Sequence, residues 1–143
     1  MPYRFTIDEK LRTVFFHAEG ELTPSEFLDC LVEVVADPGF RPGFNHLVDL
    51  TCCTRLRLSA QHMRQRTDAD QKLGDRLGSG QCALVTNSFF LHAVTRIYKI
   101  LMRDGPLQIE LFSDLAQACR WLGLATSLTP CRKITAQAAT GKP

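Results

Sequence analysis

The chain has 143 residues, of which 45% are hydrophobic, and a net charge of +2 from seventeen Lys and Arg residues against fifteen Asp and Glu residues. This length supports one domain with one core, which buries roughly two-thirds of the surface of the unfolded chain. The even charge lacks the basic excess typical of nucleic-acid-binding proteins. We see no secretory signal and no apolar run of roughly 20 residues, so we expect a cytoplasmic protein without membrane insertion.

The metal- and cofactor-binding residue types are scattered along the chain. Its six cysteines include no Cys-x-x-Cys pair, and its histidines lack the spacing of a zinc site. There is no Gly-x-Gly-x-x-Gly stretch and no phosphate-binding loop. We therefore expect no metal and no cofactor. We expect all four histidines to lie at the surface: His17, His46, His62 and His92.

The first third of the chain carries signals for two strands, a helix and a third strand. Alternating apolar and polar residues at 3–7, followed by a second strand at 11–18, predict an antiparallel hairpin. The capping box Thr23-Pro24-Ser25-Glu26 starts a helix, which ends at Asp37-Pro38-Gly39. The short apolar run at 46–50 predicts a buried central strand of a parallel sheet.

The remaining elements continue to alternate. A helix with few apolar positions is expected to lie mostly in water, and a very apolar helix follows a buried strand. An edge strand and a last short helix complete the order. The predicted ranges are 59–77 for the polar helix, 82–86 for the strand, 88–103 for the apolar helix, 107–111 for the edge strand and 114–122 for the last helix.

These elements predict an α/β fold. The order is an N-terminal hairpin followed by alternating helices and strands, which favours a mixed, mainly parallel sheet of about five strands with helices on its faces. We expect a single domain over residues 1–123. Residues 124–143 show no periodicity, so we expect a flexible C-terminal tail.

Four stretches give the chain a resemblance to a known family. They are Gly20-Glu21-Leu22-Thr23-Pro24-Ser25-Glu26-Phe27, Asp37-Pro38-Gly39-Phe40-Arg41-Pro42-Gly43, Val48-Asp49-Leu50-Thr51 and Phe112-Ser113-Asp114-Leu115-Ala116-Gln117-Ala118. With the order of elements, they resemble the SpoIIAA-like, STAS/CRAL-TRIO-related proteins of bacteria over about residues 3–123. The resemblance implies a STAS-like fold.

The resemblance also points to one serine. In STAS relatives that act as anti-sigma-factor antagonists, a strand ending in Asp-Leu-Ser leads to a loop whose serine is phosphorylated at the start of the next helix. Here the strand end corresponds to Asp49-Leu50-Thr51 and the phosphoacceptor region to Ser59, with Arg57 in place of the acidic residue. Ser59 is therefore a candidate phosphoacceptor, and the alternative is that it only caps the helix that follows.

The segment after the central strand is the candidate loop for a ligand or a partner. Asp49 stands at the carboxyl end of that strand, where open parallel sheets bind ligands, and the simpler interpretation is that it only bonds backbone N–H groups of the loop that follows. A reactive cysteine thiolate in this loop would need a neighbouring cation. The arginines of the loop could bind an anionic group of a ligand. The alternative is that they form a solvated face whose charge is balanced by Asp68 and Asp70. The candidate residues are Asp49, Thr51, Cys53, Thr54, Arg55 and Arg57, and the arginine cluster continues to Arg64 and Arg66.

The apolar helix carries more hydrophobic surface than one sheet face needs. One stripe, containing Phe90, Leu91, Val94, Tyr98 and Leu101, is expected to face the sheet. The second stripe is a candidate dimer face: Phe89, Ala93, Ile97 and Ile100.

Three functions remain open on these observations. We favour a non-enzymatic regulatory or protein-interaction domain resembling the anti-sigma-factor antagonists, working as a homodimer and with a regulatory protein as a further partner. The alternatives are a module that binds a small apolar ligand or lipid, as the CRAL-TRIO relatives do, and a hydrolase or thiol enzyme centred on Asp49, Cys53 and Ser59. An apolar cavity would favour the ligand, and an exposed apolar patch would favour the partner.

Overall fold

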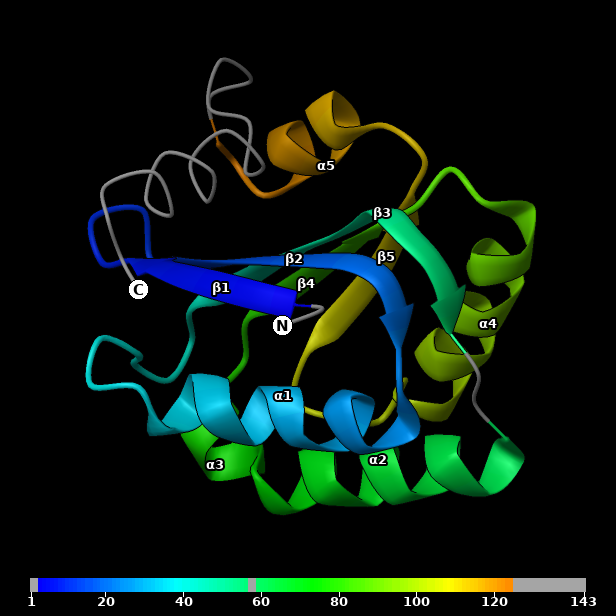
Figure 1. Ribbon diagram of the computed structural model, residues 1–143. Helices are drawn as coiled ribbons and strands as arrows, with labels where there is room; N and C mark the ends of the chain where they lie inside the picture. The colour runs from blue at the N-terminus through cyan, green and yellow to red at the C-terminus, as the bar shows by residue number, and fades with distance from the viewer. Residues whose placement is uncertain (1–2, 57–58, 125–143) are drawn as a thin grey trace.

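A computed structural model describes residues 3–56 and 59–124 of the chain. Five strands form one sheet in the order β1-β2-β3-β4-β5. The pair β1-β2 is antiparallel and the other pairs are parallel (Figure 1). The strands are β1 (Tyr3–Asp8), β2 (Thr13–Leu22), β3 (Asn45–Leu56), β4 (Gln81–Val85) and β5 (Gln108–Phe112). The predicted α/β fold with a mixed sheet of five strands is confirmed.

In the described part of the chain, five helices connect or follow the strands. The capping box at Thr23 forms as predicted, with Glu26 bonding back to the Thr23 N–H. The polar helix is divided at Leu73 into a long and a short piece. The helices are α1 (Pro24–Ala36), α2 (Ala60–Lys72), α3 (Gly74–Leu77), α4 (Phe89–Leu101) and α5 (Leu115–Trp121).

The topology decides which face of the sheet each helix covers. The parallel strands follow one another in chain order, and crossovers between parallel strands are almost always right-handed, so the connecting helices are expected on the same face of the sheet. In Figure 1, α1, α2 and α3 lie below the sheet, α4 lies at its right-hand end, and α5 lies above it. Within residues 3–56 and 59–124 the strand order does not reverse, so this part of the sheet has no topological switch point of the kind that places a ligand crevice at strand ends in doubly wound sheets.

Strand β3 corrects the prediction of a loop after residue 50. It continues to Leu56 and pairs with β2 up to Leu22, with register shifts between His17 and Glu19 and between Gly20 and Glu21. Among the described residues, β3 pairs with β4 only from His46 to Asp49. Residues 50–56 therefore belong to a two-stranded ribbon that bends toward the helices (Figure 1). β-bulges produce such bends, and Gly20 supports this one with a φ of 67°.

The core is divided differently on the two faces of the sheet. Under α5, one cluster around Phe15, Leu47 and Val85 fills the space and extends to Leu124. On the opposite face, the buried side chains form two clusters, one around Val34 and Leu84 and the other around Phe16, Leu50 and Leu56. Residues 125–143, which include nearly all of the predicted tail, lie outside the described part of the chain.

Candidate functional site

Asp49, the carboxylate at the end of the part of β3 that pairs with β4, is fully buried. Its Oδ1 accepts hydrogen bonds from the backbone N–H of Thr51 at 2.9 Å and from the Thr51 hydroxyl at 2.6 Å. Its Oδ2 lies 3.4 Å from Nδ1 of His17 on the neighbouring strand. Asp49 thus organises the backbone that follows it, as the simpler of the two interpretations predicts.

The two adjacent cysteines point in opposite directions, as expected for neighbours on a strand. Cys52 is exposed, whereas Cys53 is buried and its thiol donates to the Arg55 carbonyl at 3.6 Å. Burial raises the pKa of Cys53, which opposes the formation of a nucleophilic thiolate. The Arg55 side chain turns away to Glu21 at 3.7 Å, and Thr54 is exposed.

Ser59 is the N-cap of α2. Its hydroxyl accepts from the His62 backbone N–H at 3.1 Å, and the His62 ring lies 3.2 Å from the Ser59 N–H. This capping role is confirmed, and phosphorylation of Ser59 stays a prediction. Arg57, the other candidate beside it, lies outside the described residues.

The hydrogen bonds of the candidate residues lead to different partners. Asp49 contacts His17 and Thr51, Cys53 contacts the Arg55 carbonyl, and Ser59 contacts His62. These contacts give no support to an enzyme built from Asp49, Cys53 and Ser59. In the described part of the chain, no group of three or more His, Cys, Asp or Glu side chains could hold a metal ion.

A buried ion pair on α2 corrects the prediction that this helix lies mostly in water. Arg66 and Asp70 are both buried, and the Arg66 Nε donates to the two Asp70 oxygens at 2.8 and 3.1 Å. The Tyr98 hydroxyl of α4 also donates to Asp70, and the Arg66 Nη1 donates to the Cys30 sulfur of α1 at 3.5 Å. Burial raises the pKa of Asp70, and the Arg66 guanidinium opposes that rise. The pair therefore joins three helices instead of forming a solvated face.

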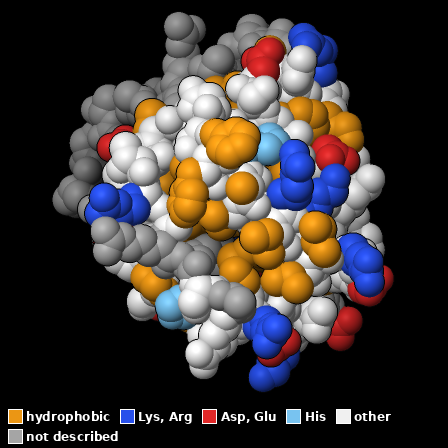
Figure 2. All heavy atoms as spheres, turned by 90° about the vertical axis from the view of Figure 1, so that its right-hand side faces the viewer, with side chains coloured by type: hydrophobic (Ala, Val, Ile, Leu, Met, Phe, Trp, Pro, Cys, Tyr) orange, Lys and Arg blue, Asp and Glu red, His pale blue; other side chains and the backbone are white. Residues whose placement is uncertain are grey.

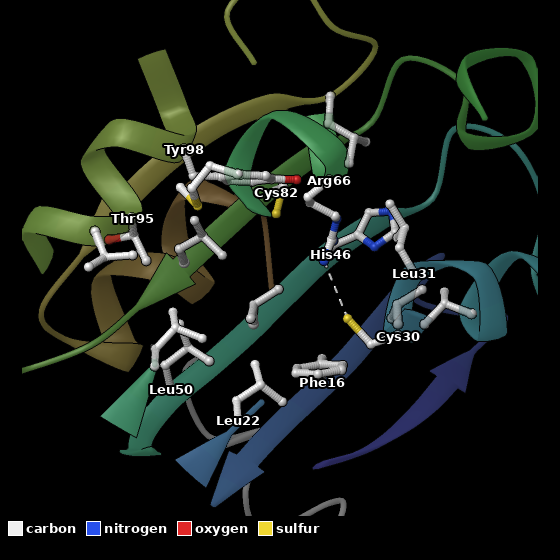
Figure 3. A pocket seen from close by; sticks show the side chains of 18 residues that line it. Phe16, Leu22, Cys30, Leu31, His46, Leu50, Arg66, Cys82, Thr95 and Tyr98 are labelled. Carbon is white, nitrogen blue, oxygen red and sulfur yellow. Dashed lines mark hydrogen bonds between the residues drawn. The ribbon is translucent and has the colours of Figure 1, made fainter. Parts of the chain in front are cut away.

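A cavity of about 80 Å³ lies between the sheet and helices α1, α2 and α4. Most of its wall is apolar, and the wall is drawn from both core clusters on this face of the sheet. Figure 3 shows Arg66, His46 and Cys82 toward one end and Leu22, Leu50 and Phe16 toward the other. The ribbon residues Leu22, Leu50 and Leu56 thus contribute to the cavity wall.

Two histidines are buried, contrary to the prediction of four surface histidines. His17 lies beside Asp49, and His46 lines the cavity with 4% of its surface exposed. His46 Nε2 has no hydrogen-bond partner among the described residues. Burial and, to a smaller extent, the Arg66 charge lower the pKa of His46 to about 4, so the ring is neutral at pH 7. The burial of His46 could not be predicted from the sequence, because the strand at 46–50 lacks the alternation of polar and apolar residues that distinguishes buried from exposed positions.

Helix α4 presents an apolar face to solvent, which Figure 2 shows toward the viewer. All four residues of the candidate dimer face are exposed, with Phe89 at 93%. Phe90 and Leu101 were expected to face the sheet but are also exposed, because Leu91, Thr95 and Tyr98 form the buried side. We call the exposed set the α4 face: Phe89, Phe90, Ala93, Ile97, Ile100 and Leu101. None of the helices in the described ranges has the length and apolar character needed to cross a bilayer.

Comparisons with known proteins identify the fold. No family model matches the chain, and no curated protein matches it. A solved structure of an uncharacterised DUF3478-family protein with a SpoIIAA-like fold, from Shewanella loihica PV-4, is similar. It superposes with a TM-score of 0.54 at 20% sequence identity, over 84% of this chain and 93% of that chain. The chain is therefore an α/β domain of SpoIIAA-like fold.

Proposed function

We propose that the chain is a non-enzymatic regulatory domain that acts through protein contacts, and that its α4 face pairs with the α4 face of a second copy. The observation that carries this proposal is the exposure of five large hydrophobic side chains along one side of a single helix. Isolated exposed apolar residues are ordinary on a protein surface, whereas a contiguous apolar patch marks an interaction site.

The charges around the α4 face suit a second copy. No acidic residue lies in α4, and the basic residues stand beside the apolar stripe and not within it. Two of the basic side chains are paired within the chain, Lys99 with Glu110 at 2.6 Å and Arg103 with Asp104 at 3.9 Å. These pairs offset the charges of Lys99 and Arg103 and leave Arg96 as the remaining basic side chain of the rim, which fits the apolar-core and polar-rim arrangement of protein interfaces. Two-fold pairing is also the commonest symmetry of soluble homo-oligomers.

Changing one residue of the α4 face is expected to weaken the dimer. Ile97 is 53% exposed, so Ile97→Lys adds a charge to the interface without disturbing the core. We expect the dissociation constant of the dimer to rise at least about tenfold, which corresponds to a loss of about 1.4 kcal/mol of binding free energy. Sedimentation velocity over a range of protein concentrations measures this change.

The matched control is Val32→Lys on α1. Val32 is 47% exposed and lies off the α4 face, so this variant introduces the same charge at a similarly exposed apolar position. It should leave the dimer unchanged. A wild-type protein that stays monomeric at high micromolar concentration, or equal weakening by the two variants, would contradict the proposed interface.

A further inference from the structure

The cavity on the helix side of the sheet has a chemistry that the proposed dimer does not use. Its wall belongs to three strands, three helices and Leu107 just before β5, and most of the lining beyond the polar end is apolar. A well-packed core leaves few voids larger than a water molecule. Here the wall of the cavity is drawn from both clusters of buried residues on this face of the sheet. The cavity is thus a site that a small apolar body can fill.

One polar atom of the cavity wall lacks a partner among the described residues. His46 is buried to 4% exposure, and its Nε2 makes no hydrogen bond there. Leaving a buried polar group unsatisfied is costly, and most such groups in folded proteins have a partner. A bound molecule with one polar group opposite His46 would supply that partner.

The charges at the polar end favour a neutral ligand. The Arg66 guanidinium already has Asp70 as its counter-ion, through two hydrogen bonds from Nε. A ligand carboxylate would therefore bring a second negative charge into a buried site beside a neutral imidazole, and burying an unpaired charge is strongly unfavourable. A ligand ammonium group would meet the buried Arg66 charge directly.

We propose that this cavity binds a small neutral molecule with one hydroxyl group on an apolar body, the hydroxyl lying against Nε2 of His46 and the body against Phe16, Leu22 and Leu50. A hydroxyl group can donate or accept a hydrogen bond, so it satisfies Nε2 in either tautomer of the neutral ring. This binding site is independent of the proposed α4 interface.

The volume limits the size of the ligand. The cavity holds about 80 Å³, whereas an engineered cavity of roughly 150 Å³ accepts benzene. The occupant is therefore no larger than a single ring, and a ring requires some movement of the wall. Met63 lines the cavity, and methionine adapts readily because its side chain is unbranched and flexible.

Phenol and toluene provide a matched pair of probes, because they differ only in a hydroxyl in place of a methyl group. We expect titration of the wild-type protein, followed by protein NMR shifts of the cavity residues, to show phenol binding at least fivefold more tightly than toluene. In His46→Leu this preference should reverse, since the cavity then has no polar partner for the hydroxyl. Val94→Phe fills part of the cavity from α4 and should abolish binding of both probes.

Three results would overturn the proposal. They are a wild-type protein that binds neither probe, a phenol preference that persists in His46→Leu, and unchanged binding in Val94→Phe, which would locate the probes on the surface. If His46→Leu does not fold, His46→Phe retains a ring at that position and serves the same comparison. Because Ile97→Lys changes the α4 face and not the cavity, its phenol affinity should equal that of the wild type.

Discussion

Replacing Asp70 with alanine is expected to lower the free energy of unfolding by about 3–5 kcal/mol, because it leaves the Arg66 charge buried without its counter-ion. Asp70 is fully buried and accepts from Arg66 at 2.8 Å and from the Tyr98 hydroxyl. The variant therefore removes a partner from two buried groups at once. Urea denaturation followed by circular dichroism measures the loss.

Asp68→Ala is the matched control for this prediction. Asp68 lies two residues earlier on the same helix but is exposed. It therefore matches Asp70 in residue type and in its location within α2, but it lacks the buried partners. Its loss should cost less than about 0.5 kcal/mol, as for ordinary surface substitutions. Equal effects of the two variants would show that Asp70 matters only through helix propensity. The double variant Arg66→Met/Asp70→Leu should recover much of the stability lost in Asp70→Ala, because it removes the unpaired charge and keeps the volume.

Acid is expected to destabilise the protein through His46. Its pKa is lowered from 6.5 to about 4 in the folded protein by burial and by the Arg66 charge. Between these pH values the unfolded chain binds a proton at this residue that the folded protein does not bind, so stability is lost as the pH falls. Since one pKa unit corresponds to about 1.4 kcal/mol, the loss between pH 6.5 and pH 4 amounts to about 3 kcal/mol.

Unfolding experiments repeated from pH 7 to pH 4 test this prediction. His46→Phe should lack the His46 part of the loss, because phenylalanine does not titrate. His92→Gln, a change of the half-exposed histidine on α4, should keep the full loss. If His46→Phe loses stability with acid as steeply as the wild type does, the titrating group lies elsewhere.

The order of elements could be predicted from the sequence because its signals are local. The capping box at Thr23 and the helix end at Pro38 depend on neighbouring residues only, and the structure shows the first helix between them, from Pro24 to Ala36. The exposed second stripe of α4 was also visible as surplus hydrophobic residues. These features can be predicted without knowing which residues from distant parts of the chain pack against them.

The polar end of the cavity could not be predicted in the same way. Arg66 and Asp70 have the spacing of an exposed ion pair on a helix surface, and their burial depends on Tyr98, which comes 28 residues later. One signal was present. Met63, Arg66, Asp70, Leu73 and Leu77 follow one another at helical spacings of three and four, which places the pair on the apolar side of the helix.

The continuation of β3 beyond residue 50 could not be predicted, because its bulged pairing removes the regular alternation of buried and exposed residues that indicates a strand. Between Leu50 and Leu56, the buried residue is Cys53, so the spacing of buried positions is three and not two. In a regular strand, the residues on one face are two positions apart. The spacing of three follows from the register shifts in the pairing of β2 with β3, near Glu19 and Gly20, and these shifts are visible only in the structure.

Because of the bent ribbon, two parts of the cavity wall differ in stiffness. From Leu50 to Leu56, β3 is paired with β2 but not with β4 among the described residues, whereas the stretch from His46 to Asp49 is paired on both sides. Segments with fewer backbone hydrogen bonds open locally at a lower free energy than the global unfolding of the protein. We therefore expect a molecule that binds in the cavity to enter and leave through fluctuations of the ribbon and not through separation of the helices, which the buried contacts of Arg66 and Asp70 tie to one another.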